Sequence, residues 1–225
     1  MNLAYCATGR SDAHLAHVNN YMLHNSAIDD FLRMQQRAQA DGIDLTIASS
    51  FRSFERQAMI WNNKFSGLRP VYDIEQNQID IALLDESERI EAIMLFSALP
   101  GASRHHFGTD MDVWDPSAVA KGYELQLNAD EYAINGPFAA LTRWLDDNMS
   151  EFGFFRPYHR YQGGVAAEPW HLSHLESASH MLRWQSVDAI ADAIKSTQIG
   201  GQESILADLE RLYAKYVTNI CPPLG

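Results

Sequence analysis

The stretch "SRHHFGTDMDVWD", residues 103–115, places two histidines, a glycine and three acids within thirteen positions. Imidazole and carboxylate groups are protein ligands that zinc accepts, although the same residue types are also common on protein surfaces. Gly108 lies between His105 and Asp112, and a glycine lets the backbone turn sharply before Asp112 enters a strand. The stretch therefore predicts a turn that leads into a strand and brings an imidazole and a carboxylate side by side.

A second stretch, "EPWHLSH", lies more than fifty residues later and supplies Glu168 and His171. A catalytic zinc site usually has three protein ligands and leaves a fourth position for water, and His105, Asp112 and His171 make up that number. On a regular strand Glu168 and His171 would face opposite sides of the sheet. Both can approach one metal only where the strand is irregular, and Pro169 favours such an irregularity because it cannot donate a ladder hydrogen bond.

These residues resemble the signature of a known family, the VanY-type zinc D-alanyl-D-alanine carboxypeptidases, which share a fold with the hedgehog signalling domain. The signature is Ser-x-His, then x-x-Gly-x-x-x-Asp, then Glu-x-Trp-His, and the matching residues are Ser103, His105, Gly108, Asp112, Glu168, Trp170 and His171. An upstream element, "SSFRSFERQ", resembles the family's Ser-x-Tyr-Arg-Ser…Gln, with Phe51 in place of the usual Tyr and with Arg52 and Gln57 retained. Together the motifs cover residues 49–171.

The resemblance implies a site with one zinc ion per chain, held by His105, Asp112 and His171. It implies that zinc makes the attacking water more acidic and polarises the scissile carbonyl. Glu168 would be the general base that takes the water proton and later passes it to the leaving amine. Trp170 is expected to pack and shape the pocket.

The resemblance also implies roles for three residues that contact the substrate. Arg52 would stabilise the developing oxyanion or hold a substrate carboxylate, since its guanidinium is planar and always charged. Ser103 is expected to hydrogen-bond the substrate near its carboxylate end. Gln57 is the other candidate substrate-binding residue, with bracing of its own helix as the alternative.

Three neighbouring residues are not expected to be ligands. His106 follows His105 on what should be extended backbone, so its side chain should point away from the metal. Asp110 shares parity with Asp112 and is expected to bind the outer nitrogen of a ligating histidine, as carboxylates in zinc sites commonly do. His174 is a spare ligand candidate.

The pattern of apolar residues predicts the elements around these motifs. Helical periodicity is found in residues 26–40, 52–65, 85–99, 136–149 and after about 176. Alternation or short apolar runs predict strands within 43–50, 123–127, 131–134, 152–155 and 165–174. Residues 66–81 should form an irregular loop or hairpin, and Ser26 should cap the first helix. The order of elements indicates an α+β fold with an antiparallel or mixed sheet and packed helices, similar to the hedgehog/D-Ala-D-Ala carboxypeptidase fold.

Length and composition limit the organisation of the chain and its partners. The 225 residues suffice for one domain over 1–225, with a motif-bearing core at about 26–175 and a C-terminal helical extension at about 176–225. The formal net charge is −12, so nucleic acid is not expected as a partner. Cys6 and Cys221 are expected to be unrelated thiols, with a single bridge between the chain ends as the alternative.

The sequence contains no candidate transmembrane segment, because no apolar run approaches the roughly 20 residues that span a bilayer. The first residues lack the basic flank and apolar stretch of a signal peptide. We therefore expect a cytoplasmic protein as the chain is written, or a periplasmic one if a leader has been removed.

The expected function is a zinc metallopeptidase that hydrolyses peptide bonds next to D-amino acids, with a peptidoglycan stem peptide or another D-Ala-containing peptide as substrate. The first choice is a D-alanyl-D-alanine carboxypeptidase, and the alternatives within the class are a peptidoglycan endopeptidase, a D-Ala-D-Ala dipeptidase and an L,D-carboxypeptidase. A non-hydrolytic zinc-containing binding module is the alternative from another class. Such a module needs neither a base nor an oxyanion partner, so Glu168 and Arg52 favour the enzyme.

Overall fold

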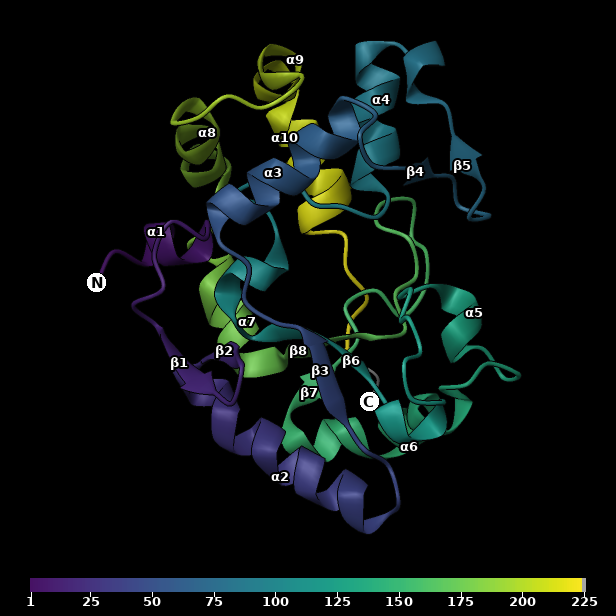
Figure 1. Ribbon diagram of the computed structural model, residues 1–225. Coiled ribbons are helices and arrows are strands. Elements are labelled where there is room, and N and C mark those ends of the chain that lie inside the picture. The colour runs from purple at the N-terminus through teal and green to yellow at the C-terminus, as the bar shows by residue number, and fades with distance from the viewer. Residues whose placement is uncertain (224–225) are drawn as a thin grey trace.

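The main sheet has four antiparallel strands, and the computed structural model describes it within residues 1–223. The strand order is β3-β6-β8-β7, with β3 Thr46–Ser49, β6 Asp110–Trp114, β8 His171–His174 and β7 Phe154–Phe155. Strands far apart in the sequence therefore lie side by side, as Figure 1 shows. The expected α+β fold with an antiparallel sheet is confirmed.

The strand register positions the residues of the two motifs. Asp112 on β6 lies opposite Ser49 of β3 on one side and opposite His171 of β8 on the other. Directly opposed residues of antiparallel strands have their Cβ atoms roughly 4.5–5.5 Å apart, so the Asp112 and His171 side chains stand next to each other. Between Ile47 and Ser49 the β3–β6 register shifts at an irregularity, after which the chain leaves the sheet toward Arg52.

Two short hairpins and a series of helices surround the sheet. The hairpins pair β1 Leu15–Val18 with β2 Tyr21–His24, and β4 Val71–Tyr72 with β5 Gln78–Ile79. The helices are α1 Leu3–Ala7, α2 Ile28–Ala40, α3 Phe54–Phe65, α4 Glu86–Met94, α5 Ala129–Tyr132, α6 Ala139–Asn148, α7 Leu175–Leu182, α8 Val187–Lys195, α9 Gln202–Ala207 and α10 Leu209–Leu212. A π-helical turn follows at Tyr213–Val217, and short 3-10 turns lie at Asn25–Ala27, Ile81–Leu83, Arg104–Phe107, Pro116–Ala118 and Met149–Phe152.

The two largest apolar cores among the described residues lie at opposite ends of the molecule. In Figure 1, α2 and α6 lie on one side of the sheet, and α3, α4, α8, α9 and α10 gather at the other end. We call the first the sheet core; it includes Phe31, Met34, Met111, Leu141, Leu145 and Leu172. We call the second the helical core; it includes Trp61, Ile90, Ile93, Ile190, Ile194 and Leu212. The C-terminal helices thus share a core with α3 and α4, while the division of residues 1–225 into domains stays a prediction.

The helices largely follow the sequence pattern, with one error at a helix start. The predicted helices around 26–40, 52–65, 85–99 and 136–149 are confirmed with shorter ends, and Asp85 caps α4 through a capping box with Glu88. Ser26 does not cap α2: it lies in a 3-10 turn, and its backbone N–H donates to His24 Nδ1. His24 therefore caps the 3-10 turn that precedes α2, and α2 itself starts after Ala27 without a side-chain cap.

The strands predicted at 123–127 and 131–134 are wrong. Residues 123–127 form no strand, and α5 covers Ala129–Tyr132. The Glu131 carboxylate accepts hydrogen bonds from the Tyr123 hydroxyl, Gln126 N–H and Asn128 N–H, which fold the segment back on itself. Asn128 in turn caps the helix, so local side-chain capping overrides the alternating apolar pattern.

Two further features concern the whole described chain. Cys6 and Cys221 are both free and buried, with no bridge between them. Among the described residues, no helix combines the length and the apolar character that crossing a membrane requires.

Candidate active site

The sheet brings three side chains with metal-binding atoms together, as the sequence predicts. His105, Asp112 and His171 each offer one ligand atom, and these atoms lie within 4.8 Å of one another. Asp112 Oδ2 is 3.4 Å from His105 Nε2, and Asp112 Oδ1 is 3.4 Å from His171 Nδ1. All three side chains are buried. The carboxylate therefore stands between two imidazole nitrogens that both face it.

A tight turn places His105 beside Asp112. His105 lies in the 3-10 turn Arg104–Phe107, which ends at Gly108 with φ 68°, and a Cβ on Gly108 would lie 2.4 Å from Leu15 Cδ2. Only glycine fits this left-handed and crowded position. His105 Nδ1 donates to the Ser50 carbonyl over 2.9 Å, which leaves Nε2 without a proton in the neutral ring. Burial lowers the pKa of His105 to about 4, so this neutral form is present at pH 7.

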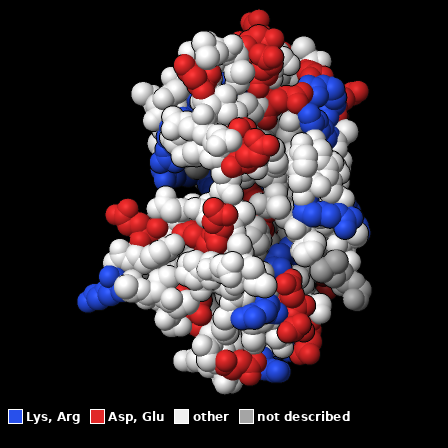
Figure 2. Space-filling view, turned by 90° about the vertical axis from the view of Figure 1, so that its right-hand side faces the viewer, with Lys and Arg blue, Asp and Glu red and all other residues white. Residues whose placement is uncertain are grey.

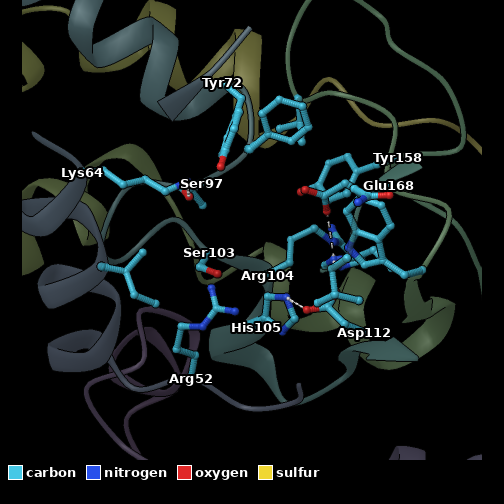
Figure 3. Close-up of a pocket in the computed structure, with 18 of the residues that line it drawn as sticks. Arg52, Lys64, Tyr72, Ser97, Ser103, Arg104, His105, Asp112, Tyr158 and Glu168 are labelled. Atoms are coloured by element: carbon cyan, nitrogen blue, oxygen red, sulfur yellow. Dashed lines mark hydrogen bonds and ion pairs between the residues drawn. The ribbon is translucent and has the colours of Figure 1, made fainter. Parts of the chain in front are cut away.

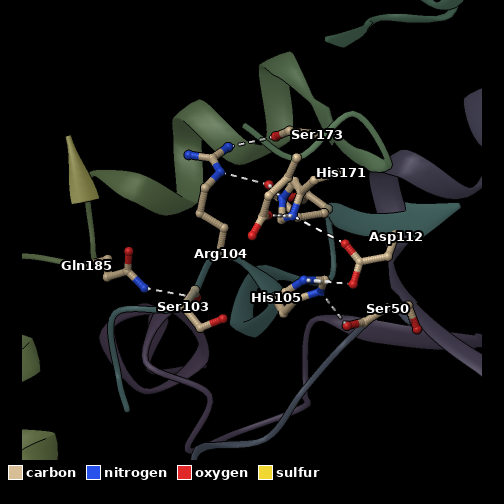
Figure 4. A network of polar contacts seen from close by, with 11 residues as sticks. Ser50, Ser103, Arg104, His105, Asp112, His171, Ser173 and Gln185 are labelled. Atoms are coloured by element: carbon tan, nitrogen blue, oxygen red, sulfur yellow. Dashed lines mark hydrogen bonds and ion pairs between the residues drawn. The ribbon is translucent and has the colours of Figure 1, made fainter. Parts of the chain in front are cut away.

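A buried carboxylate orients the other imidazole. His171 Nε2 lies 3.0 Å from Asp110 Oδ1, which leaves Nδ1 facing Asp112. Arg104 Nε donates to the same Asp110 oxygen over 2.7 Å, and its Nη2 donates to Ser173 (Figure 4). Burial opposes ionisation of Asp110, but the Arg104 charge and the contact with His171 hold its pKa well below the ordinary value. Asp110 thus occupies the outer position that its parity with Asp112 predicts.

The donor set fits a zinc ion. Two imidazole nitrogens and one carboxylate oxygen are zinc ligands of ordinary type, and each ring has its other nitrogen engaged. Asp112 Oδ1 is buried and accepts no hydrogen bond from any described residue. Burial opposes ionisation of Asp112, but the His105 and His171 rings lower its pKa. A bound cation would give this buried oxygen a partner.

Glu168 lies at the same centre because β8 begins only at His171. A turn precedes the strand, closed by a hydrogen bond from His171 N–H to the Glu168 carbonyl. Glu168 Oε2 then lies 3.4 Å from His171 Nδ1, so residues three positions apart face one point. Burial raises the pKa of Glu168 above its ordinary value, which is the direction that suits a proton acceptor working near neutral pH.

The centre opens into a cavity of about 550 Å³. Lining residues with polar or aromatic side chains include Arg52, Lys64, Tyr72, Ser97, Ser103, Arg104, Tyr158, Glu168 and Trp170. Figure 3 shows Arg52 and Ser103 beside His105, with their polar atoms in the cavity. The Ser103 side chain makes no capping hydrogen bond to the 3-10 turn that follows it. Both residues therefore belong to the wall of the cavity.

Gln57 does not face the cavity, contrary to its expected contact with substrate. It is fully buried on α3, where its Oε1 accepts from Arg52 Nη1 over 2.8 Å and its Nε2 donates to the Ala98 carbonyl over 2.7 Å. Both the oxygen and the nitrogen of the amide are therefore engaged within the protein. Gln57 therefore orients Arg52, a role that differs from the alternative of bracing its own helix.

Two further histidines have other partners. His106 points away from the centre as expected, although its backbone is a 3-10 turn rather than extended. Its Nδ1 donates to the Arg52 carbonyl and its Nε2 accepts from Gly101 N–H. His174, the spare ligand candidate, instead contacts Asp30 and Ser177.

Several residues of this cavity have no role in the sequence-based prediction. The Tyr158 ring lies edge-on to His171 with 5.0 Å between ring centroids, and Lys64 and Tyr72 line the opposite wall. No motif marks these positions. For Arg104 a signal exists: it lies six residues before Asp110 in the opening stretch, and a basic and an acidic residue flanking one turn can pair across it.

The chain is similar in sequence to known proteins. The chain is 34% identical over 121 residues to an uncharacterized protein of Haemophilus influenzae, and the match covers 53% of this chain and 92% of that protein. It is 28% identical over 141 residues to a D-alanyl-D-alanine carboxypeptidase of Enterococcus faecalis, covering 61% of this chain and 42% of that one. The chain thus spans less than half of the Enterococcus protein.

Two solved structures share the fold. VanYB in complex with D-alanine-D-alanine has a TM-score of 0.52 and 21% identity, covering 87% of this chain and 90% of the other. A mutant of the vancomycin resistance D,D-pentapeptidase VanY in complex with Zn(II) has a TM-score of 0.50 and 22% identity, covering 80% and 88%.

The family comparison covers most of the chain and all of the motifs. The model of the VanY: D-alanyl-D-alanine carboxypeptidase family matches residues 20–177, which include the sheet, the three candidate ligands, Arg52 and Glu168. This chain belongs to the VanY family of D-alanyl-D-alanine carboxypeptidases.

Proposed function

We propose that the chain is a zinc-dependent D-alanyl-D-alanine carboxypeptidase that removes a C-terminal D-alanine from peptidoglycan-derived peptides. The observation that carries the proposal is the convergence of His105, Asp112 and His171 within 4.8 Å, with Glu168 next to His171 and an open cavity in front. The VanYB complex with D-alanine-D-alanine and the Zn(II) complex of VanY support the substrate and the metal.

His105, Asp112 and His171 would hold the metal, one ion per chain. A zinc ion at these ligands supplies Lewis acidity, which polarises a carbonyl and makes water a stronger acid. Asp110 and the Ser50 carbonyl keep the two imidazoles in the orientation that binding requires.

The remaining steps belong to the residues around the ligands. Glu168 accepts the proton of the attacking water and returns it to the nitrogen of the leaving amino acid. Arg52, held by Gln57, carries a positive charge beside the reacting carbonyl, where it stabilises the developing oxyanion or the substrate carboxylate. Ser103 offers its hydroxyl to the same end of the substrate.

The test combines a metal assay with a product assay. Protein purified without chelator should contain close to one zinc per chain, and His171→Ala should lose it. Glu168→Gln should keep the zinc and lose about 10²–10⁴-fold of the rate of D-alanine release. Folded wild-type protein that takes up no zinc would contradict the metal assignment, and full activity of Glu168→Gln would contradict the role of the base.

Mass analysis of the products identifies the bond that is cut. Release of one D-alanine from a peptide that ends in D-Ala-D-Ala supports the proposal. Cleavage inside the stem, cleavage only of free D-alanyl-D-alanine, or release of a residue after an L-configured centre would identify an endopeptidase, a dipeptidase or an L,D-carboxypeptidase. Binding without cleavage of any peptide would identify a non-hydrolytic zinc-containing module.

A further inference from the structure

A lysine with no role in the reaction described above lies on the far wall of the cavity. Lys64, near the end of α3, is half-buried, and its Nζ donates to Ser97 Oγ over 2.7 Å. Figure 3 shows Lys64 and Ser97 together across the cavity from Glu168, with the Tyr72 hydroxyl pointing toward the same region. Three groups that can donate a hydrogen bond thus meet away from the metal ligands.

The positive charges of Lys64 and Arg52 form no direct ion pair, and Glu168, whose charge acts on both, lies across the cavity from Lys64. No ion pair among the described residues includes Lys64 or Arg52, whose hydrogen bonds go to the neutral side chains of Ser97, Gln57 and Ser49. Arg69, exposed at the rim, adds a further positive charge to the lining. The chain carries 29 acidic residues and a net charge of −12, so counter-ions are not scarce. In Figure 2 acidic and basic side chains are both spread over the surface, and basic side chains are also visible inside a recess.

An anion that enters an open cavity stabilises a partly buried cation in its wall. Burial lowers the pKa of Lys64 to about 8, so the ammonium group is still mostly protonated at pH 7 but has lost part of its hydration. A carboxylate that enters the cavity would restore this lost stabilisation through a charge-assisted hydrogen bond.

The helix gives a scale for the separation between Lys64 and Gln57, the residue that holds Arg52. Gln57, which holds Arg52, and Lys64 are seven residues apart on α3, so they share one face. Two helical turns correspond to about 10 Å along the axis. An extended peptide advances about 3.3 Å per residue, so this distance corresponds to roughly three residues of a bound chain.

We infer that Lys64 and Ser97 form a second anion-binding subsite, which holds a carboxylate of the peptide substrate about two to three residues from the group that Arg52 contacts. The inference rests on the proposed function, because that function makes the cavity a peptide-binding groove. It names a substrate class: peptides with one more carboxylate besides the C-terminal one, at a fixed spacing. Lys64 is therefore a residue that determines specificity and takes no part in proton transfer.

The experiment measures binding in the absence of turnover. The experiment uses two N-acetylated peptides that end in D-Ala-D-Ala. Two residues before the first of these D-alanines, one peptide carries glutamate and the other glutamine. Their dissociation constants are measured by calorimetry on zinc-loaded chain with Glu168→Gln, so that the peptide is not consumed. We expect the glutamate peptide to bind about 10-fold more tightly, which corresponds to about 1.4 kcal/mol.

Variants assign the preference to the lysine. Lys64→Met should reduce the ratio of the two dissociation constants to about one, mainly by weakening the glutamate peptide. Lys64→Arg keeps the charge and should keep the preference. Lys195→Met removes an exposed lysine at the end of α8 and should leave the ratio unchanged, which controls for net charge.

The outcomes separate this inference from the proposed function. Equal binding of the two peptides, binding of neither, or a preference that survives Lys64→Met would overturn the subsite. Tight and charge-selective binding by a wild-type chain that cleaves neither peptide would support the subsite and overturn the carboxypeptidase. Cleavage of both peptides with equal binding would support the carboxypeptidase and overturn the subsite.

Discussion

Asp110 connects the metal ligands to the protein interior. It is fully buried, accepts from Arg104 Nε over 2.7 Å and contacts His171 Nε2 over 3.0 Å. Burial alone would lower the pKa of His171, but its contacts with Asp110, Asp112 and Glu168 raise it well above the ordinary value. A zinc ion therefore competes with a proton for the His171 ring, and the ring orientation set by Asp110 favours the metal.

Replacing Asp110 by Asn should weaken zinc binding by about 10–100-fold, because an amide holds the imidazole without adding negative charge. The change also leaves Arg104 as a buried cation without its counter-ion, which should lower the free energy of unfolding by about 3–5 kcal/mol. Chelator competition measures the first effect and urea unfolding the second. Asp147→Asn, at an exposed position on α6, is the matched control. Unchanged zinc affinity in Asp110→Asn would show that the outer contact is dispensable.

The sequence predicts the site residues that belong to a motif of fixed spacing. It misses the residues that reach the site only because distant segments pack together. The positions of His105, Asp112, Glu168 and His171 follow from motifs whose order along the chain can be read directly. Lys64 has no such signal, because its contact with Ser97 joins residues 33 positions apart in the sequence. The motif predicts that Gln57 lies at the site but not how it is oriented, since the fold decides whether an amide faces the cavity or Arg52.

Among the elements of the site, the turn from residue 104 to 108 has a strict requirement for glycine at its end. Gly108 has φ 68°, and a Cβ there would lie 2.4 Å from Leu15 Cδ2 and 3.0 Å from the His24 nitrogen. The turn therefore depends on glycine both for its backbone conformation and for the close approach of the β1–β2 hairpin. Any shift of the turn would move His105 relative to Asp112.

Gly108→Ala should destabilise the protein and weaken zinc binding, and a second glycine separates the two causes. Gly42 also has a positive φ, of 84°, but nothing lies within 4 Å of the position that a Cβ would occupy there. Gly42→Ala should therefore cost only the left-handed backbone strain, about 1–2 kcal/mol of the free energy of unfolding. Gly108→Ala should cost more in urea unfolding and also raise the zinc dissociation constant. Equal losses in the two variants, with unchanged zinc affinity, would contradict a role for the hairpin contact.

Helices are more predictable than strands in this chain for a physical reason. The periodicity that predicts α3 or α4 lies within one helix, and local caps at Ser53 and Asp85 reinforce it. The strands of the main sheet have two to five residues each, and their partners are distant in the sequence. The false strand at 123–127 shows the same limit, because its apolar residues pack on the sheet core from a loop.

In the whole molecule, the cavity lies between the side of the sheet core and the side of the helical core. Asp112, Trp170 and His171 come from the sheet side, whereas Arg52 is held by α3, and Lys64 lies on α3 itself, beside the helical core. Trp61 of the same helix donates its Nε1–H to the Gly200 carbonyl, so the C-terminal segment supports the wall that carries the positive charges. Substrate binding therefore depends on how firmly the two cores are joined.

If residues 1–225 form one cooperative domain, damage to the helical core should destabilise both cores. Leu212 on α10 is 1% exposed, so Leu212→Ala should lower the free energy of unfolding by about 2–5 kcal/mol. Leu83 is 83% exposed, and Leu83→Ala should change it by less than about 0.5 kcal/mol. Native-state hydrogen exchange should then show reduced protection of the slowest amides in both α2 and α8 of Leu212→Ala. Reduced protection confined to α8 and α10 would instead mean that the cores unfold separately, and the C-terminal helices would then be a unit of their own.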